Sequence, residues 1–187
     1  MHDAMTIAVT TFMPGEYRLK HADAGWERAA CAALRRQVFC AEQGLFDGDD
    51  RDAIDDDALP IAALACMAGM AERVVGTVRI HRPAPDAEPG LWQGSRLAVL
   101  AGYRRSAWLG SELIAHAVST AHARGCTRFL AQVQVQNVKL FERLHWTSLD
   151  AITVQGRPHV LMQAQLGHYP PRLADEIAFY TATRAAA

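Results

Sequence analysis

Residues 95–111, SRLAVLAGYRRSAWLGS, decide the fold class of this chain. The apolar run LAVL predicts a buried strand, a loop with Arg104 and Arg105 follows, and Gly110 and Ser111 open a long amphipathic segment. The first N–H groups of a helix have no partner within the helix, and the helix dipole adds partial positive charge there. A strand, a basic loop and a helix N-terminus in this order therefore predict a site for a diphosphate.

Composition limits the class of protein. The chain has 187 residues, 50% hydrophobic and 21% charged, which predicts one domain over residues 1–187. Residues 1–14 are expected to form an N-terminal extension, and residues 171–187 a C-terminal tail helix. A net charge of −1 argues against nucleic acid as a partner, and no apolar run approaches the roughly 20 residues of a membrane helix. Scattered cysteines and an N-terminus unlike a signal peptide favour a cytoplasmic location.

Hydrophobic periodicity divides the chain into alternating strands and helices. Asp23 is a candidate N-cap for a first helix that ends near Gly44, and a second long helix ends at Gly125. We expect strands at residues 17–20, 61–67, 74–80, 91–100, 127–135, 146–154 and 159–166, and a short helix at 137–144. These elements predict a single α/β domain.

Three local motifs carry a resemblance to the GNAT superfamily of N-acetyltransferases. Residues 105–110, RSAWLG, are similar to the acyl-CoA loop R-x-x-G-x-G/A, with Trp108 in place of the first glycine. Arg104 could equally hold the arginine position, with one residue inserted. Residues 140–146, LFERLHW, resemble the segment F-Y-e-k-L-G-F, with Phe141 where many members carry a tyrosine. Residues 34–44, LRRQVFCAEQG, are similar to the start of one bacterial branch, which continues with an acidic stretch and D-x-x-A. The resemblance covers most of the chain.

Two branches of the superfamily share further segments with this chain. VGTVRI, GSRLAV and VQVQNVKLFERLHW resemble acetyltransferases associated with nitrogen starvation. The acyl-homoserine lactone synthases share R-x-x-x-F, here Arg35 to Phe39, and W-E-x-S-R-F, which reads WQGSRL in this chain. Gln93 replaces the acid of that second motif, and no tryptophan occurs near Leu45. Both departures weaken the likeness to the lactone synthases.

The resemblance implies a central, mostly antiparallel sheet of six or seven strands. Its two middle strands, residues 91–100 and 127–135, would run parallel and diverge, and acetyl-CoA would lie in that fork. Trp108 would cover the pyrophosphate or the adenine, or else fill a hydrophobic gap. The residues expected to contact the cofactor are Leu97, Ala98, Val99, Arg104, Arg105, Ser106, Ala107, Trp108, Leu109, Gly110, Ser111, Asn137 and Phe141. A backbone N–H of the strand before the loop would hold the oxyanion.

Acetyl transfer to an amine also needs a group that takes a proton from the amine. Glu42 is a candidate at the end of the first helix, although it could be a solvated carboxylate. Asp55 could recognise the amine or belong to a solvated acidic loop, and His81 could be a catalyst or a rim histidine. Phe141 has no proton to donate to the departing thiolate. Cys40, near the expected pocket, could be a nucleophile, but a small buried apolar residue is the favoured interpretation.

Three functions stay open from the sequence. The first is an N-acetyltransferase for a small amine or amino acid, acting by direct attack in a ternary complex. The second is a synthase with a longer acyl donor, which would need a deeper apolar tunnel behind the fork. The third is a non-enzymatic acyl-CoA-binding module. The acidic run at residues 47–57 fails the EF-hand pattern, so we expect no metal. That run would favour a cationic acceptor if it reached the pocket, and a homodimer is possible.

Overall fold

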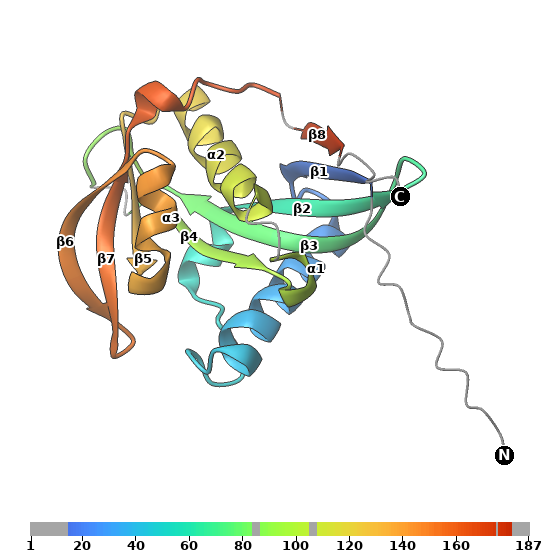
Figure 1. Ribbon diagram of the computed structural model, residues 1–187, viewed down its shortest axis with the longest axis horizontal. Coiled ribbons are helices and arrows are strands. Elements are labelled where there is room, and N and C mark those ends of the chain that lie inside the picture. Colours follow the sequence, from blue (N-terminus) through green and yellow to red (C-terminus); the bar gives the residue numbers. More distant parts are fainter. Residues whose placement is uncertain (1–14, 84–86, 105–107, 175, 181–187) are drawn as a thin grey trace, which may run out of the picture.

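The computed structural model describes residues 15–83, 87–104, 108–174 and 176–180. In these ranges eight strands form one sheet in the order β6-β7-β5-β4-β3-β2-β1-β8 (Figure 1). The strands are β1 (Glu16–His21), β2 (Leu59–Met67), β3 (Met70–His81), β4 (Leu91–Val99), β5 (Arg128–Gln134), β6 (Trp146–Val154), β7 (Arg157–Ala164) and β8 (Glu176–Tyr180).

Helices cover both faces of the sheet (Figure 1). α1 (Gly25–Arg35) lies on one face and continues as a π-helix, η1 (Arg36–Glu42). α2 (Trp108–Ala123) and the short α3 (Val138–Arg143) lie on the other face. Short 3-10 turns complete the chain: η2 (Ala53–Asp56), η3 (Ala101–Tyr103), η4 (Val135–Asn137) and η5 (Leu166–His168). The core lies between the sheet and these helices.

The predicted fork between the two middle strands is confirmed. β4 and β5 pair in parallel only from Leu91–Arg128 to Gly94–Ala131, whereas the other strand pairs are antiparallel. Just beyond the last parallel pair, β4 has a bulge. Thr77 of β3 pairs with Ala98 while Arg79 pairs with Ser95, so two residues of β4 face one residue of β3. A bulge interrupts the ladder of hydrogen bonds, and it therefore frees backbone groups where the strands part.

The C-terminal tail differs from the prediction. The sequence predicts a tail helix, but residues 176–180 form the edge strand β8, which pairs antiparallel with β1. Ile177 and Phe179 alternate with exposed residues and pack against the core, a period of two that belongs to a strand. This strand raises the number from the expected six or seven to eight. The strand edge with which it pairs belongs to β1, far away in the sequence.

The ends of the first long helix differ in detail from the prediction. Ala24 is the N-cap rather than Asp23, and its backbone N–H donates to the Glu27 carboxylate at 3.1 Å. Asp23 instead accepts a hydrogen bond from Lys20. The expected end near Gly44 is confirmed, because Gly44 adopts a φ of +58° that favours glycine.

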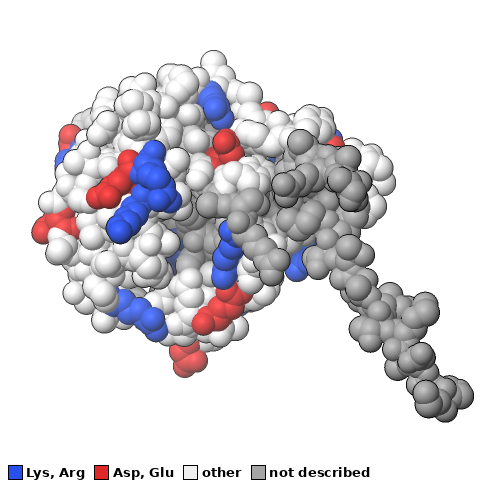
Figure 2. Space-filling model, in the orientation of Figure 1, with Lys and Arg blue, Asp and Glu red and all other residues white. Residues whose placement is uncertain are grey.

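Charge on the surface is mixed. Figure 2 shows acidic and basic side chains interspersed over the visible face, without a patch of one sign. Within the described ranges, no helix combines the length and the apolar content that crossing a membrane requires.

Candidate active site

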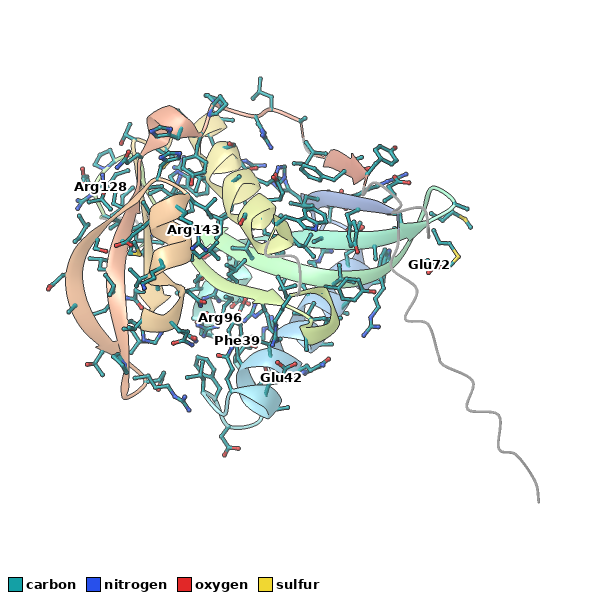
Figure 3. The ribbon with its side chains drawn as sticks, in the orientation of Figure 1. Phe39, Glu42, Glu72, Arg96, Arg128 and Arg143 are labelled. Atoms are coloured by element: carbon teal, nitrogen blue, oxygen red, sulfur yellow. The ribbon has the colours of Figure 1, made fainter. Side chains whose placement is uncertain are left out.

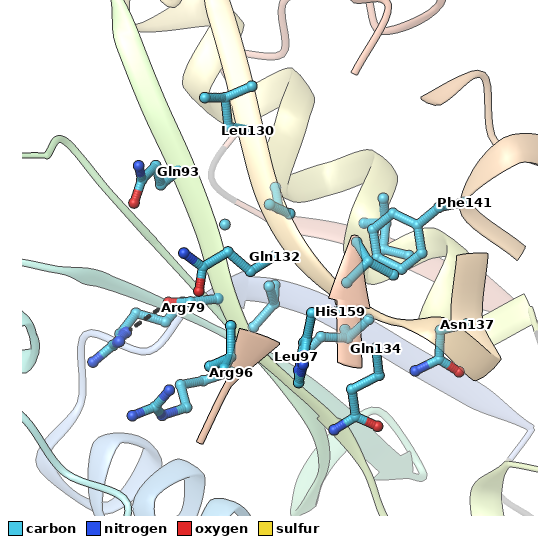
Figure 4. A pocket seen from close by; sticks show the side chains of 18 of the residues that line it. Arg79, Gln93, Arg96, Leu97, Leu130, Gln132, Gln134, Asn137, Phe141 and His159 are labelled. Carbon is cyan, nitrogen blue, oxygen red and sulfur yellow. Dashed lines mark hydrogen bonds between the residues drawn. The ribbon is translucent and has the colours of Figure 1, made fainter. Parts of the chain in front are cut away.

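A cavity of about 420 Å³ opens at the fork between β4 and β5 and reaches both faces of the sheet. Its polar half lies on the face covered by α1, where Arg79, Gln93, Arg96 and Gln132 contribute to the wall. Figure 4 shows Arg79 and Arg96 on one side of the fork and Asn137 and Phe141 on the other. The apolar half lies behind the fork, lined by Ile114, Ala117, Val118, Phe129, Phe141 and Trp146.

Strand alternation produces these two halves. Successive side chains of a strand point to opposite faces, so polar and apolar residues that alternate in β3, β4 and β5 separate into two walls. Glycine is required at position 94, in the last parallel pair of β4 and β5, because a Cβ there would come within 2.9 Å of the Phe129 ring. The absence of a side chain at this position lets Phe129 pack beside β4 and form part of the apolar wall.

Aspartates of the acidic loop form ion pairs with arginines beside the polar half of the cavity. Arg35 bridges two carboxylates, with N–O distances of 2.8 Å to Asp50 and 2.5 Å to Asp55. Arg79 contacts Asp52 at 2.6 Å and Asp55 at 3.0 Å. Arg96 contacts Asp50 at 2.9 Å and Asp52 at 3.0 Å. Arginines therefore balance the carboxylates that reach the cavity, which removes the sequence-based reason to expect a cationic acceptor. We call this set the Asp–Arg network: Arg35, Asp50, Asp52, Asp55, Arg79 and Arg96.

Asp55 is tightly held within this network. Its carboxylate accepts two hydrogen bonds from Arg35 and one from the backbone N–H of Asp52. Burial alone would raise the pKa of Asp55, but these bonds outweigh it and hold the pKa well below its usual range. A carboxylate with such a low pKa is a weak proton acceptor. The catalytic role of Asp55 stays a prediction, and its contacts favour positioning the arginines.

Glu42 lies at the end of η1 (Figure 3). It is not among the described residues that line the cavity, and its carboxylate pairs with Arg104 at 2.7 Å. Arg104 also donates from Nε to the backbone oxygen of Val99 at 2.6 Å, which places the guanidinium at the end of β4. Cys40 is likewise absent from the described lining. His81, by contrast, lies in the cavity wall.

The predicted cofactor residues divide into three groups. Leu97, Asn137 and Phe141 line the cavity, while Ala98 is buried beside it. Gly110 lies in the first turn of α2, which begins two residues earlier than expected, at Trp108. Outside the backbone of α2, no atom of the described residues lies within 4 Å of where a Cβ on Gly110 would be, so these residues leave the turn open to close approach. Arg105, Ser106 and Ala107 lie outside the described residues.

Trp108 fills a hydrophobic gap. Its ring lies edge-on to Tyr17 at 5.1 Å and tilted to Phe179 at 6.0 Å, between the side chains of β1 and β8. Leu109 is also buried, so its side chain belongs to the core. The substitution of the first glycine of the loop motif by tryptophan is thus explained by packing.

Residues of β5 and β7 that line the cavity were not predicted from the sequence. Gln134 and His159 form a cross-strand pair and both line the cavity. The Gln134 amide donates to the Gln43 side chain at 3.0 Å, and Arg157 donates to the Gln43 backbone oxygen at 3.0 Å. This clasp (Gln43, Gln134 and Arg157) joins the end of η1 to the β6–β7 hairpin over the polar half. No local sequence pattern predicts this clasp, because Gln43 lies more than 90 residues from both Gln134 and Arg157 in the sequence.

Comparisons with known proteins agree with this geometry. The acetyltransferase (GNAT) family matches residues 31–146. An acyl-homoserine-lactone synthase from Ralstonia nicotianae is 31% identical over 180 residues, covering 80% of this chain and 85% of that protein.

Solved structures share the fold. A candidate N-acetyltransferase from Lactobacillus plantarum has a TM-score of 0.68 at 24% identity, covering 80% of this chain and 98% of that one. A CoA-dependent acyl-homoserine lactone synthase, solved with SAM and isopentyl-CoA, has a TM-score of 0.59 at 19% identity. The match covers 74% of this chain and 76% of that one. The likeness to the nitrogen-starvation branch stays a prediction. The chain belongs to the GNAT acetyltransferase family and is an acyltransferase homologous to the acyl-homoserine-lactone synthases.

Proposed function

We propose that this acyltransferase moves an acyl chain longer than acetyl from a CoA thioester to the amine of a small molecule. The observation that carries the proposal is the apolar half of the cavity behind the fork. An acetyl group at the fork would leave the walls formed by Ala117, Val118 and Trp146 without contact. Burying a methylene in such walls stabilises the complex by about 0.8 kcal/mol, roughly fourfold in affinity.

The donor would be held along the free half of β4. Arg104 and Arg105 with the first turn of α2 around Gly110 would bind the diphosphate, because the helix N-terminus and the guanidinium groups both favour anions. Asn137 and Phe141 would flank the thioester end. The bulge at Arg96 and Leu97 leaves an extra residue without a partner on β3, which supports a backbone N–H there as the oxyanion donor.

The acceptor would be small. The clasp of Gln43, Gln134 and Arg157 ties η1 to β5 and β7 at the cavity wall, and these contacts would narrow the space for an acceptor. Gln93 replaces the acid of the lactone-synthase motif, and Leu45 lines the cavity where the likeness lacks a tryptophan. These replacements support an amine acceptor whose recognition differs from that of the lactone synthases.

Acetyl transfer from acetyl-CoA is the second candidate. The family that matches residues 31–146 is described as acetyltransferases, and the Lactobacillus plantarum structure as a candidate N-acetyltransferase. An acetyl group fits the fork as well as a longer chain does, but it would bury less of the apolar half. The described cysteines are all free, which supports a cytoplasmic location for either activity. A homodimer stays a prediction.

Thiol release from acetyl-, hexanoyl- and octanoyl-CoA against a panel of small amines and amino acids tests both candidates. We expect kcat/KM to rise from acetyl to hexanoyl or octanoyl with at least one amine. A maximum at acetyl-CoA would support the second candidate, and no amine-dependent release from any donor would overturn both.

Arg104→Ala should weaken CoA binding about tenfold, measured by calorimetry. A charge-assisted hydrogen bond contributes about 1.5–3 kcal/mol, and loss of the existing Arg104–Glu42 pair offsets part of that. Arg128→Ala is the matched control, because Arg128 is similarly exposed and pairs with Glu88 away from the cavity. Unchanged affinity in both Arg104→Ala and Arg105→Ala would disprove this placement of the diphosphate.

A further inference from the structure

The imidazole of His81 occupies a distinctive place in the cavity. His81 is the last residue of β3 and pairs across the ladder with Gln93, which in turn pairs with Leu130 in the closed part of the fork. Only 6% of His81 is exposed, yet it lines the polar half of the cavity together with Gln93. The ring therefore lies beside the point where β4 and β5 begin to part, on the side where an acceptor would lie.

One ring nitrogen of His81 lacks a partner. Nδ1 is buried, and none of the described residues forms a hydrogen bond with it. The neighbouring Gln93 side chain acts on the pKa of the ring in the direction that favours the protonated imidazole, as an accepting amide oxygen would. If Gln93 accepts from Nε2–H, then Nδ1 carries the lone pair. A buried polar atom without a partner is costly, so such an atom in a cavity wall points to a ligand that supplies a proton.

We infer that His81 Nδ1 accepts the proton of the substrate ammonium, so that His81 is the general base of acyl transfer. The inference rests on the proposed function, since it assumes an amine acceptor in the polar half of the cavity. It holds for any acyl chain length, because the base acts on the acceptor and not on the donor. The two other candidate bases are engaged in ion pairs, Glu42 with Arg104 and Asp55 with Arg35, whereas His81 Nδ1 is not paired with any of the described residues.

The charges that face the ring fit this role. Burial and the nearby Arg79 guanidinium lower the pKa of His81, whereas Asp52, Asp55 and the Gln93 hydrogen bond act in the opposite direction. The pKa of His81 falls below its ordinary value of about 6.5. The imidazole is therefore neutral at pH 7 and able to accept a proton.

Protons and electron pairs balance in the proposed transfer. The ammonium gives one proton to Nδ1, and the amine lone pair attacks the thioester carbonyl carbon while the C=O electron pair moves to oxygen. When the carbonyl re-forms, the C–S bond breaks and the thiolate leaves with its electron pair. The new amide nitrogen loses its second proton, which neutralises the thiolate, and the proton on His81 returns to water. No oxidant or further reactant is needed.

His81→Gln tests the inference through its pH profile, with the best amine and donor from the panel above. We expect kcat/KM at pH 7 to fall by about 10²–10⁴, the usual contribution of a positioned base. The deficit should shrink as the pH rises toward about 10, where an alkyl amine loses its proton without help. A merely structural role would lower kcat/KM by the same factor at every pH, and that outcome, or no loss at all, would overturn the inference.

His168→Gln is the matched control. Its ring stacks on His145 at 3.7 Å and lies outside the described cavity lining, so the pH profile should stay that of the unsubstituted protein.

Nitrogen-15 NMR of the unsubstituted, histidine-labelled protein gives a readout that needs no substrate. We expect Nδ1 of His81 to be unprotonated at pH 7, and a proton on Nδ1 would overturn the inference even if an amine were acylated. If no donor and amine react, the proposed function fails and the assignment of its base fails with it, whereas a protonated Nδ1 beside a working acylation overturns the base assignment alone.

Discussion

Ala117→Phe should lower kcat/KM for octanoyl-CoA by about 100-fold and leave acetyl-CoA nearly unchanged. Ala117 lies on α2 with 2% of its surface exposed and lines the apolar half of the cavity. A phenylalanine ring there would occupy the space that we assign to the end of the acyl chain. If four methylenes lose their burial, the loss is about 3 kcal/mol, or somewhat more than 100-fold. Steady-state thiol release with the three donors measures the effect.

The control for this experiment is Ala115→Phe on the same helix. Ala115 is only partly buried and lies outside the described cavity lining, so the substitution should leave the order of the donors unchanged. Overpacking costs about 1–3 kcal/mol in a core, so thermal melts of both variants would separate stability from selectivity. An equal loss with every donor in Ala117→Phe would contradict the assignment of the acyl chain to the apolar half.

Asp50→Asn should lower the free energy of unfolding by about 3–5 kcal/mol, the usual effect of removing one partner of a buried ion pair. The Asp50 carboxylate is 1% exposed and lies 2.8 Å from Arg35 and 2.9 Å from Arg96. Its neutralisation would remove the counter-charge that the two buried guanidinium groups share, so that each keeps only one carboxylate partner, Asp55 for Arg35 and Asp52 for Arg96. We expect the midpoint of thermal unfolding to fall by about 10 °C, measured by circular dichroism or calorimetry.

Asp56→Asn is the matched control in the same loop. Asp56 is largely exposed and pairs with Arg51 at 3.4 Å, and exposed pairs contribute about 0–1 kcal/mol. Equal melting temperatures for the two variants would mean that the Asp–Arg network does not stabilise the fold.

Acid should destabilise the protein through the same network. The pKa values of Asp52 and Asp55 lie below their ordinary values, because hydrogen bonds from Arg79 and Arg35 outweigh burial. The unfolded chain therefore binds more protons than the folded chain near pH 4, and stability falls as the pH drops below about 4. Urea unfolding between pH 7 and pH 3 would show this loss, which Asp55→Asn should reduce. A flat stability across that range would contradict the ion pairs described above.

Local sequence was enough to predict the elements of the fork. The apolar run before Arg104, the alternation in residues 127–135 and the glycine stops are signals within a few residues of one another, and the parallel pair confirms the arrangement that the family resemblance implied. The tail was predicted wrongly. Its five-residue strand is selected by the free edge of β1, whose position does not depend on the tail sequence.

Some residues of the candidate site were likewise predictable from local sequence, and others were not. Arg104, Asn137 and Phe141 belong to motifs, and a motif is a local pattern that sequence displays directly. The packing role of Trp108 could not be predicted from the sequence, because its partners Tyr17 and Phe179 come from opposite ends of the chain. The same holds for Asp55, whose carboxylate resembles a solvated acid in sequence and is a doubly held partner of Arg35 in space.

The sequence by itself therefore determined the α/β class, the strand–loop–helix order and the family resemblance, since these follow from periodicity and short motifs. Tertiary structure alone decided that the cavity has a polar and an apolar half, that arginines neutralise the acidic loop, and that His81 lies beside Gln93. The physical reason is that burial and electrostatic partners depend on which distant segments the sheet brings together. A residue's chemistry is set by those neighbours as much as by its own side chain.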